Sequence, residues 1–222
     1  MPTFGFSAYL KLICLNSKPQ RREVRGRLTP GDGGGYDFHR SLRLLAHRYL
    51  LGKEDAAELI RSVLSIVKDA ERNSARSGLE RLFAWVEQNP GSFFDVPPAT
   101  FKSPGGVFNV QFLPDFGAVI GGKRTAVHIW NTKAPDLAPH FCHGALALFP
   151  KIYAGQEGAP EDLAVLSLRD GRLYRLSEAG DVAGFGLSVA MAIENLFQRE
   201  ARDLGLTINP PKHDPHAPPP PS

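Results

Sequence analysis

Residues 107–133 have the sequence VFNVQFLPDFGAVIGGKRTAVHIWNTK, and this stretch decides how the second half of the chain folds. Apolar residues that favour strands lie on both sides of Gly121 and Gly122, a pair that is typical of a tight hairpin turn. The pattern predicts one strand that ends at Asp115 and a second strand that ends at residues 131–133, NTK. Polar side chains from both strand ends should therefore meet at one edge of a sheet.

Helical spacing of apolar residues dominates the chain before this stretch. The predicted helices are residues 7–15 with Ser7 as the N-cap, 36–51 with Gly52 as the stop signal, 55–76 and 79–87. A basic segment at 18–27 and a break rich in Pro and Gly at 29–35 separate the first two of these helices. The first part of the chain is therefore expected to be helical.

Helices are expected again at residues 138–154 and 185–204, with a strand pair between them that turns at Asp170 and Gly171. Strands in the second half that are flanked by helices predict an α/β fold with a small mixed central sheet and a helical N-terminal portion. The expected organisation is one domain over 1–206, with a helical part at 1–92, a sheet-containing core at 93–206 and a disordered Pro-rich tail at 207–222.

The composition is that of a globular protein able to bury a core, because 42% of the 222 residues are apolar and 22% are charged. A formal net charge of +3 permits contact with a polyanion without requiring it. Cys14 and Cys142 have no CxxC partner, so a zinc knuckle or an iron–sulfur cluster is not expected. Both thiols should be reduced, with a single disulfide between them as the alternative. No apolar run approaches the roughly 20 residues of a membrane span, and no signal peptide is indicated. We therefore expect a cytoplasmic protein with no membrane partner.

The residues at the two strand ends have the chemistry that a metal-dependent phosphodiesterase needs: an acid, a second oxygen ligand and a lysine. Within a strand, residues i and i+2 share a face, so Asn131 and Lys133 should point the same way and Thr132 the opposite way. Asp115 on the neighbouring strand could then meet Asn131 and Lys133 across the sheet. An Asn stands where a second carboxylate is expected, and its amide carbonyl ligates a hard cation more weakly.

These features resemble the PD-(D/E)XK nuclease superfamily, and within it the RecB-like branch. The resemblance rests on Pro114-Asp115, on Asn131-Thr132-Lys133 and on the helix expected after them. SAYLKLIC at 7–14 and GYDFHRSL at 35–42 are similar to the opening helix and to the Gly-to-His motif of that branch. The resemblance implies a restriction-endonuclease-like fold over about residues 7–200 and hydrolysis of phosphodiester bonds in nucleic acid, with DNA favoured over RNA.

The resemblance also implies roles for individual residues. Asp115 would be the central ligand of one Mg²⁺ or Mn²⁺ ion, Asn131 the second ligand and His39 a further ligand. Lys133 would be the catalytic lysine that positions the attacking water. The candidates for contact with the phosphate backbone are the basic residues Lys18, Arg21, Arg22, Arg25 and Arg27, for which a solvated basic loop is the alternative.

Two other functions stay open at this point. Asn131 favours a module that keeps the nuclease fold for binding or scaffolding but has lost cleavage, with a protein partner as one option. A small-molecule enzyme or binding protein of unrelated α+β fold is the third hypothesis. No GxSxG or HExxH motif occurs, and no Ser-His-Asp arrangement stands out; His128, which alternates with Val127 and Ile129, is expected to be solvated.

Overall fold

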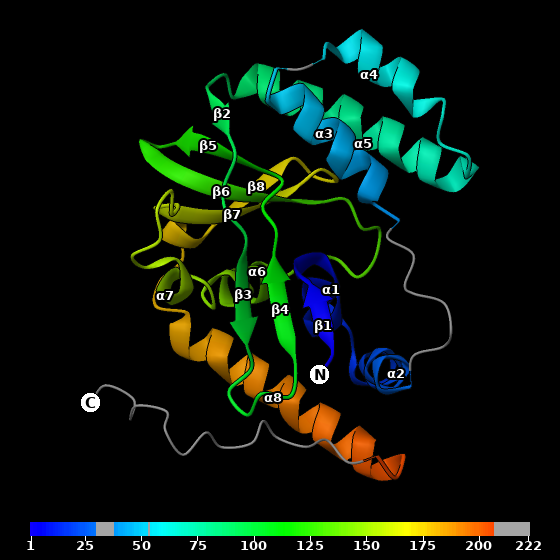
Figure 1. The fold of residues 1–222 in the computed structure, drawn as a ribbon, viewed down its shortest axis with the longest axis vertical. Helices are drawn as coiled ribbons and strands as arrows, with labels where there is room; N and C mark the ends of the chain where they lie inside the picture. The colour runs from blue at the N-terminus through cyan, green and yellow to red at the C-terminus, as the bar shows by residue number, and fades with distance from the viewer. Residues whose placement is uncertain (30–37, 53, 207–222) are drawn as a thin grey trace.

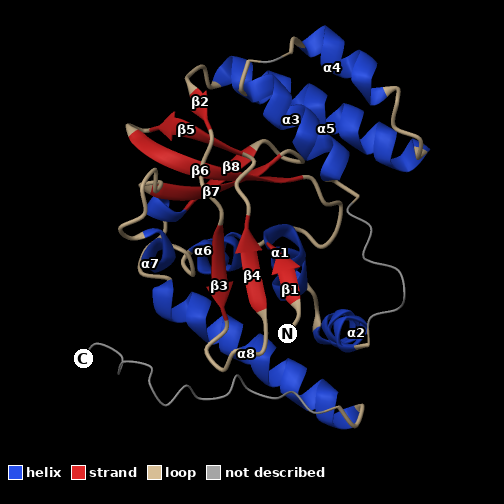
Figure 2. Cartoon of the chain, in the orientation of Figure 1, coloured by secondary structure: helices blue, strands red, loops and turns tan. Residues whose placement is uncertain are grey.

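The computed structural model describes residues 1–29, 38–52 and 54–206, which form a mixed α/β protein with two mixed sheets (Figures 1 and 2). The α/β class and the mixed character of the sheet are therefore confirmed. The Pro-Gly-rich break from residue 30 onward, the first residues of the helix predicted at 36–51, and the tail predicted to be disordered at 207–222 lie outside the described residues.

The larger sheet has five strands in the order β2-β5-β6-β7-β8. Their bounds are Phe93–Phe94, Phe116–Ile120, Lys123–Trp130, Asp162–Ser167 and Arg172–Arg175. Both predicted hairpin turns are present, since Gly121 and Gly122 join β5 to β6 with φ of 58° and 78°, and Gly171 between β7 and β8 has φ of 69°. Strands β6 and β7 are parallel and are joined through helices α6 (Pro139–Leu146) and α7 (Pro150–Tyr153).

The smaller sheet has three strands in the order β1-β4-β3, with bounds Thr3–Gly5, Asn109–Phe112 and Ala99–Lys102. The prediction of a single strand ending at Asp115 was wrong, because the chain changes sheets there. Strand β4 ends at Phe112 in the smaller sheet, and the hairpin strand β5 begins at Phe116 in the larger one. Pro114 lies in the link and has no N–H to continue a ladder of hydrogen bonds.

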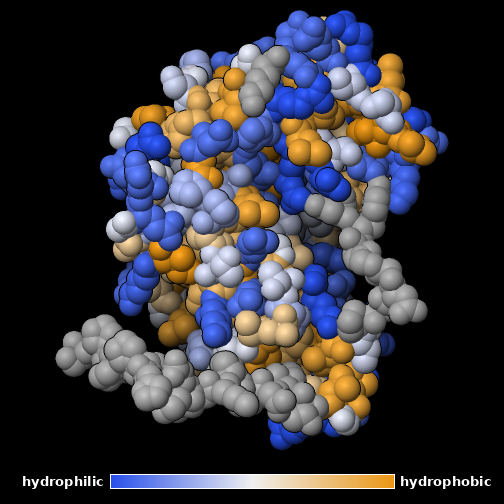
Figure 3. Space-filling view, viewed as in Figure 1, coloured by the Kyte–Doolittle hydropathy of each residue, from blue (hydrophilic) through white to orange (hydrophobic). Residues whose placement is uncertain are grey.

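Helices α3 (Arg40–Leu50) and α5 (Asp69–Gln88) cover one face of the larger sheet, and α4 (Ala56–Val63) packs against these two helices farther from the sheet (Figure 1). The predicted helix 55–76 is two helices, and 79–87 is the second half of α5. Helix α4 begins at a capping box of Asp55 and Glu58, and the Ser65 hydroxyl donates to the Ser62 carbonyl just after it ends. Such local side-chain bonds compete with helix continuation. Hydrophilic and hydrophobic residues are mixed on the surface over these three helices in Figure 3, and Leu44, Leu64 and Val67 are exposed.

The other face of the larger sheet packs on the smaller sheet and on helices α1 (Phe6–Cys14), α6 and α8 (Ala183–Asp203). Helix α2 (Ser17–Leu28) lies against α8, so the basic segment 18–27 is a helix and not a loop. Phe4 from β1 packs edge-on against Phe108 and Phe197, which brings the start and the end of the described chain into one core. The sheet thus separates two apolar clusters, one under α3–α5 and one under α1, α6 and α8.

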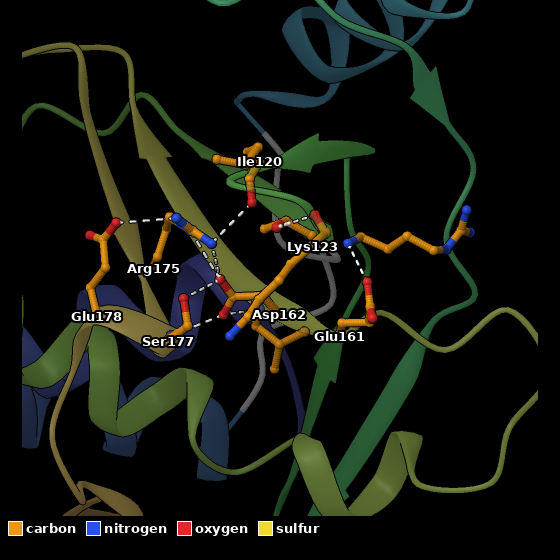
Figure 4. A network of polar contacts seen from close by, with 10 residues as sticks. Ile120, Lys123, Glu161, Asp162, Arg175, Ser177 and Glu178 are labelled. Carbon is orange, nitrogen blue, oxygen red and sulfur yellow. Dashed lines mark hydrogen bonds and ion pairs between the residues drawn. The ribbon is translucent and has the colours of Figure 1, made fainter.

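Buried acidic residues anchor the elements around this frame. Asp162 at the start of β7 accepts hydrogen bonds from Arg175 and from the Ser177 backbone and hydroxyl, and Arg175 also donates to the Ile120 carbonyl (Figure 4). This network fixes the end of β8 against the β5–β6 turn, so we assign Asp162 a structural role. In the described part of the chain, no helix combines the length and the apolar character needed to span a membrane.

Helices α6 and α8 cross at two glycines, and this contact gives the first prediction. A Cβ at Gly186 would lie 2.2 Å from the Gly144 carbonyl oxygen, whereas a Cβ at Gly184, in the same helix, would meet nothing within 4 Å. We expect Gly186→Ala to force the helices apart and to lower the free energy of unfolding by about 1–3 kcal/mol. Urea unfolding followed by circular dichroism measures this. Gly184→Ala is the matched control and should leave stability unchanged or raise it by up to about 1 kcal/mol. Equal stability of the two variants would contradict the contact.

Candidate functional site

Polar side chains gather where β6 leaves the larger sheet, beside the N-terminal end of α3. Asp115, which precedes β5, donates its backbone N–H to the Val127 carbonyl at 2.9 Å. Phe116 pairs with Val127 at the start of the antiparallel hairpin, and the Asp115 side chain just before this pair meets His128, the next residue of β6. This pair, and not the pair of Asp115 with Asn131, is the one that the sheet brings together.

The Asp115 carboxylate is 7% exposed and is surrounded by nitrogen atoms. Its Oδ2 accepts the Ile129 backbone N–H at 2.6 Å and lies 3.1 Å from His128 Nδ1. Its Oδ1 lies 3.8 Å from Arg43 Nε on helix α3. A buried carboxylate needs compensation of this kind, because leaving it unpaired costs several kcal/mol.

His128 is 2% exposed, which contradicts the expectation that it is solvated. Its side chain shares a face of β6 with Ala126 and Trp130, and that face packs under helix α1. His128 Nε2 lies 2.6 Å from the hydroxyl oxygen of Ser7, and the Phe6 ring packs edge-on at 5.2 Å between centroids. Ser7 is not the N-cap of its helix, which is Gly5, so the hydroxyl is free to meet the imidazole.

The contacts on its two nitrogens indicate the tautomer of His128. A carboxylate oxygen 3.1 Å from Nδ1 favours a proton there, and Nε2 is then the acceptor for the Ser7 hydroxyl proton. His128 Nδ1 is close to the Asp115 carboxylate, but the two groups are not aligned for a hydrogen bond. Among the described residues, this buried nitrogen has no hydrogen-bond partner. The interaction between His128 and Asp115 is therefore electrostatic in this conformation.

The other predicted site residues lie nearby but make different contacts. Asn131 is 8% exposed and donates its amide to the carbonyl and the hydroxyl of Ser74 on α5, at 3.3 and 3.2 Å. His39 Nε2 lies 3.4 Å from the Thr132 hydroxyl. Lys133 is exposed. Strand β6 ends at Trp130, so the expectation that Asn131 and Lys133 share a strand face was wrong.

The residues around Asp115 do not fit a Mg²⁺ or Mn²⁺ centre. Such ions need several oxygen ligands, preferably carboxylates. Within residues 1–29, 38–52 and 54–206, no group of three His, Cys, Asp or Glu side chains could hold a metal ion. The β6 side chain that meets the Asp115 carboxylate is His128, and a (D/E)XK motif starting at this position would fall on residues 128–130, which are His-Ile-Trp. The motif predicted at 131–133 is displaced by three residues from the position that faces the carboxylate.

The basic helix α2 uses part of its charge inside the protein. Arg21 and Arg25 donate to Glu200, which is fully buried on α8, at 2.6 and 2.5 Å. The hydrogen bond from Arg21 is the main reason that the pKa of Glu200 is lowered, and the same bond raises the pKa of Arg21. Arg27 lies 4.2 Å over the Phe4 ring, and burial lowers its pKa.

The remaining cations of α2 face the surface. Lys18 and Arg22 are exposed and make no ion pair with the acids of the described chain. A hollow of about 520 Å³ is lined by Ser17, Lys18, Arg21, Arg22 and Arg25. Four of the five residues predicted to contact phosphate therefore lie on one surface, and Arg27 is turned inward.

A second hollow, of about 290 Å³, adjoins the polar cluster at the carboxyl ends of the parallel strands β6 and β7. Trp130 and Thr132 line it from β6 and its exit, and Ser167 lines it from the end of β7. In open α/β sheets, ligands commonly bind outside the carboxyl ends of the strands. Thr132, whose hydroxyl meets His39, is thus also part of the wall of this hollow.

Sequence comparison found no protein-family model that matches this chain and no curated protein that is significantly similar to it. The function must therefore be argued from the site itself. Sequence reasoning missed Ser7, His128, Arg43 and Ser74 as members of the cluster. A weak signal was present for Ser7, which follows a short strand segment and a glycine at the start of a helix, but no local pattern pairs it with His128.

The second prediction concerns the charge of Asp115. Asp115→Asn keeps the shape of the side chain, but its amide group will donate to His128 Nδ1 or face the Ile129 N–H. We expect the ring proton of His128 to move to Nε2, and the free energy of unfolding to fall by about 1–3 kcal/mol. Ring ¹⁵N chemical shifts measure the tautomer, and urea unfolding measures stability. The exposed residue Asp136 provides the control, since Asp136→Asn should change stability by no more than about 0.5 kcal/mol. An unchanged tautomer in Asp115→Asn would show that the carboxylate does not orient the ring.

Proposed function

We propose that the chain is a nuclease-fold module that binds nucleic acid and holds no divalent cation at Asp115. The observation that carries the proposal is the environment of this carboxylate. Ile129 N–H, His128 and Arg43 surround it, and the residue facing it across the hairpin is a histidine where metal-dependent cleavage needs a second acid. A cation at Asp115 would have to compete with the guanidinium of Arg43.

The order of elements supports the restriction-endonuclease-like part of the proposal. The hairpin β5–β6 is followed by helix α6 and then by β7, which pairs with β6 in parallel. Helix α5 precedes the sheet and packs on its other face. This is the order that the resemblance to the RecB-like branch implies, and that branch acts on DNA more often than on RNA.

The surface of α2 supplies the contact with phosphate. Lys18 and Arg22 are free of ion pairs with the described acids, while Arg21 and Arg25 each share their charge with Glu200. Few phosphates would be neutralised, so binding should be weak and its dependence on salt shallow, because the slope scales with the number of phosphate contacts. The net charge of +3 agrees with modest electrostatic attraction.

Metal-dependent hydrolysis is the competing function. It is favoured by the proximity of its predicted residues, because Asp115 meets α3 through Arg43, and His39 at the start of the same helix meets Thr132 beside Asn131. It would require Asp115 and Asn131 to take up Mg²⁺ or Mn²⁺ with His39, and Lys133 to turn towards the ion. A metal titration separates it from the binding module.

The third prediction tests nucleic-acid binding by fluorescence anisotropy with labelled single-stranded DNA, double-stranded DNA and RNA, over a salt series in EDTA. We expect binding at low salt, tightest for DNA. The double variant Lys18→Glu/Arg22→Glu should weaken binding and reduce the slope of log K against log salt by about 2, or about 1 for each lost phosphate contact. Lys102→Glu/Lys151→Glu changes the net charge equally at exposed lysines on β3 and α7 and should retain most of the affinity. Equal losses in the two variants, or no binding by the unmodified chain, would overturn the proposal.

The fourth prediction is that Mg²⁺ and Mn²⁺ leave the melting temperature unchanged relative to EDTA. An ion that binds only the folded state must stabilise it, so thermal unfolding detects such binding directly. A rise in melting temperature with either ion that disappears in Asp115→Asn would support the competing function and contradict ours. A rise that persists in Asp115→Asn would place the ion elsewhere on the protein.

A further inference from the structure

We propose that Ser7, His128 and Asp115 form a hydrolytic site that acts on small carboxylic esters. The three residues come from helix α1, strand β6 and the link before β5, and they form one line of contacts. Ser7 Oγ lies 2.6 Å from His128 Nε2, and His128 Nδ1 lies 3.1 Å from Asp115 Oδ2. This activity is separate from nucleic-acid binding and does not rest on the function proposed above.

The protonation pattern that the contacts favour is the one that base catalysis needs. With its proton on Nδ1, next to the carboxylate, His128 presents an unprotonated Nε2 to the Ser7 hydroxyl. His128 is 2% exposed, so water competes little for this nitrogen. The misalignment at Nδ1 does not count against the site, because such hydrogen bonds are often poorly aligned until substrate is bound.

The position of Ser7 supplies a second catalytic element. It lies in the first turn of α1, directly after strand β1, in the sequence Gly5-Phe6-Ser7. Gly5 is the N-cap and offers no side chain to the first backbone N–H groups of the helix. These donors have no intrahelical partner, and they point from the end of the helix at which Ser7 lies. Backbone N–H groups placed in this way can stabilise a developing oxyanion.

The chemistry needs water as its only co-reactant. Ser7 Oγ attacks the ester carbonyl carbon, His128 Nε2 takes the hydroxyl proton, and the C=O electron pair moves to the carbonyl oxygen. The tetrahedral intermediate collapses, the bond to the alcohol oxygen breaks, and His128 returns the proton to that oxygen. A water molecule then repeats both steps on the acyl-serine, releases the carboxylic acid and restores the Ser7 hydroxyl. Asp115 acts as a positioning residue, because it contacts the imidazole and not the substrate.

The packing around the histidine limits the substrate to small acyl groups. Phe6 and Phe112 pack against the His128 ring at 5.2 and 6.2 Å between centroids, and Phe149 packs against both phenylalanines. Ser7 itself is half-buried. An acetyl ester is therefore a better probe than a long-chain ester, which this aromatic cluster would exclude.

The alternative explanation is that the Ser7 hydroxyl serves only to satisfy a buried imidazole. The two explanations differ in reactivity, because a merely structural hydroxyl is not nucleophilic. A fluorophosphonate probe makes this distinction: an activated serine displaces fluoride from phosphorus, its proton leaves through the histidine, and a stable covalent adduct remains.

The fifth prediction is that the full chain forms this adduct at Ser7, located by mass spectrometry of peptides, and hydrolyses p-nitrophenyl acetate. Ser7→Ala should abolish labelling, and His128→Gln should slow labelling and hydrolysis by about 100-fold or more. Ser17→Ala, at an exposed serine on α2, is the matched control and should label at Ser7 like the unmodified chain. Asp115→Asn should move the ring proton of His128 and also slow the labelling of Ser7. A purely structural role for the carboxylate would leave the rate of labelling unchanged.

Failure of this proposal would be recognised independently of the nucleic-acid experiment. No adduct at Ser7 in the unmodified chain would overturn the hydrolytic site whatever the variants do, so the test survives even if His128→Gln does not fold. Undiminished labelling in a folded His128→Gln would overturn it equally. Lys102→Glu/Lys151→Glu should label normally, because β3 and α7 contribute no residue to the line of contacts.

Discussion

The contacts of the Asp115 carboxylate connect the elements that lie on the two faces of the larger sheet. The carboxylate is buried, and its partners come from three directions: the backbone of β6 through Ile129, helix α3 through Arg43, and helix α1 through His128 and Ser7. The helices on opposite faces of the larger sheet are therefore tied to one charged group. Removing any one partner would leave a buried charge less compensated, which is more costly than the loss of an exposed ion pair.

Other buried acids in the fold also join two segments of the chain. Glu200 holds α2 on α8, Asp162 holds β8 on the β5–β6 turn, and Glu194 accepts hydrogen bonds from Ser103 and from the backbone of Gly105 and Val107 in the turn before β4. Each acid sits on a helix or a strand and ties a second segment of the chain to it. Asp115 differs from these acids because one of its partners is a histidine. The imidazole has a second ring nitrogen, which contacts a third side chain, the Ser7 hydroxyl.

Features that depend on a few neighbouring residues could be predicted from the sequence, and features that depend on pairing could not. The hairpin turns at Gly121-Gly122 and Asp170-Gly171 and the final helix were predicted because glycine with positive φ and helical spacing are local signals. The change of sheet at Pro114 depends on which strand finds which partner. The burial of His128 depends on α1 packing over β6. Asp115 was predicted at the end of a strand but lies in the link before β5. Its partner was misjudged by three residues, because the packing of the hairpin and not the spacing along the chain decides that His128 meets the carboxylate.

The contact between Asp115 and His128 also relates the two proposals, since both the nuclease resemblance and the Ser-His-Asp line involve Asp115. A carboxylate opposite the Asp115 position would repel it and call for a cation between them, which is the basis of a metal site. A histidine at that position needs no ion between the two side chains, because its ring N–H faces the carboxylate. Its other nitrogen must then find a partner within a closely packed aromatic cluster, and Ser7 provides it. In the proposed hydrolytic site, an imidazole beside Asp115 therefore takes the place that a cation would have between two acids, and its second nitrogen meets the Ser7 hydroxyl.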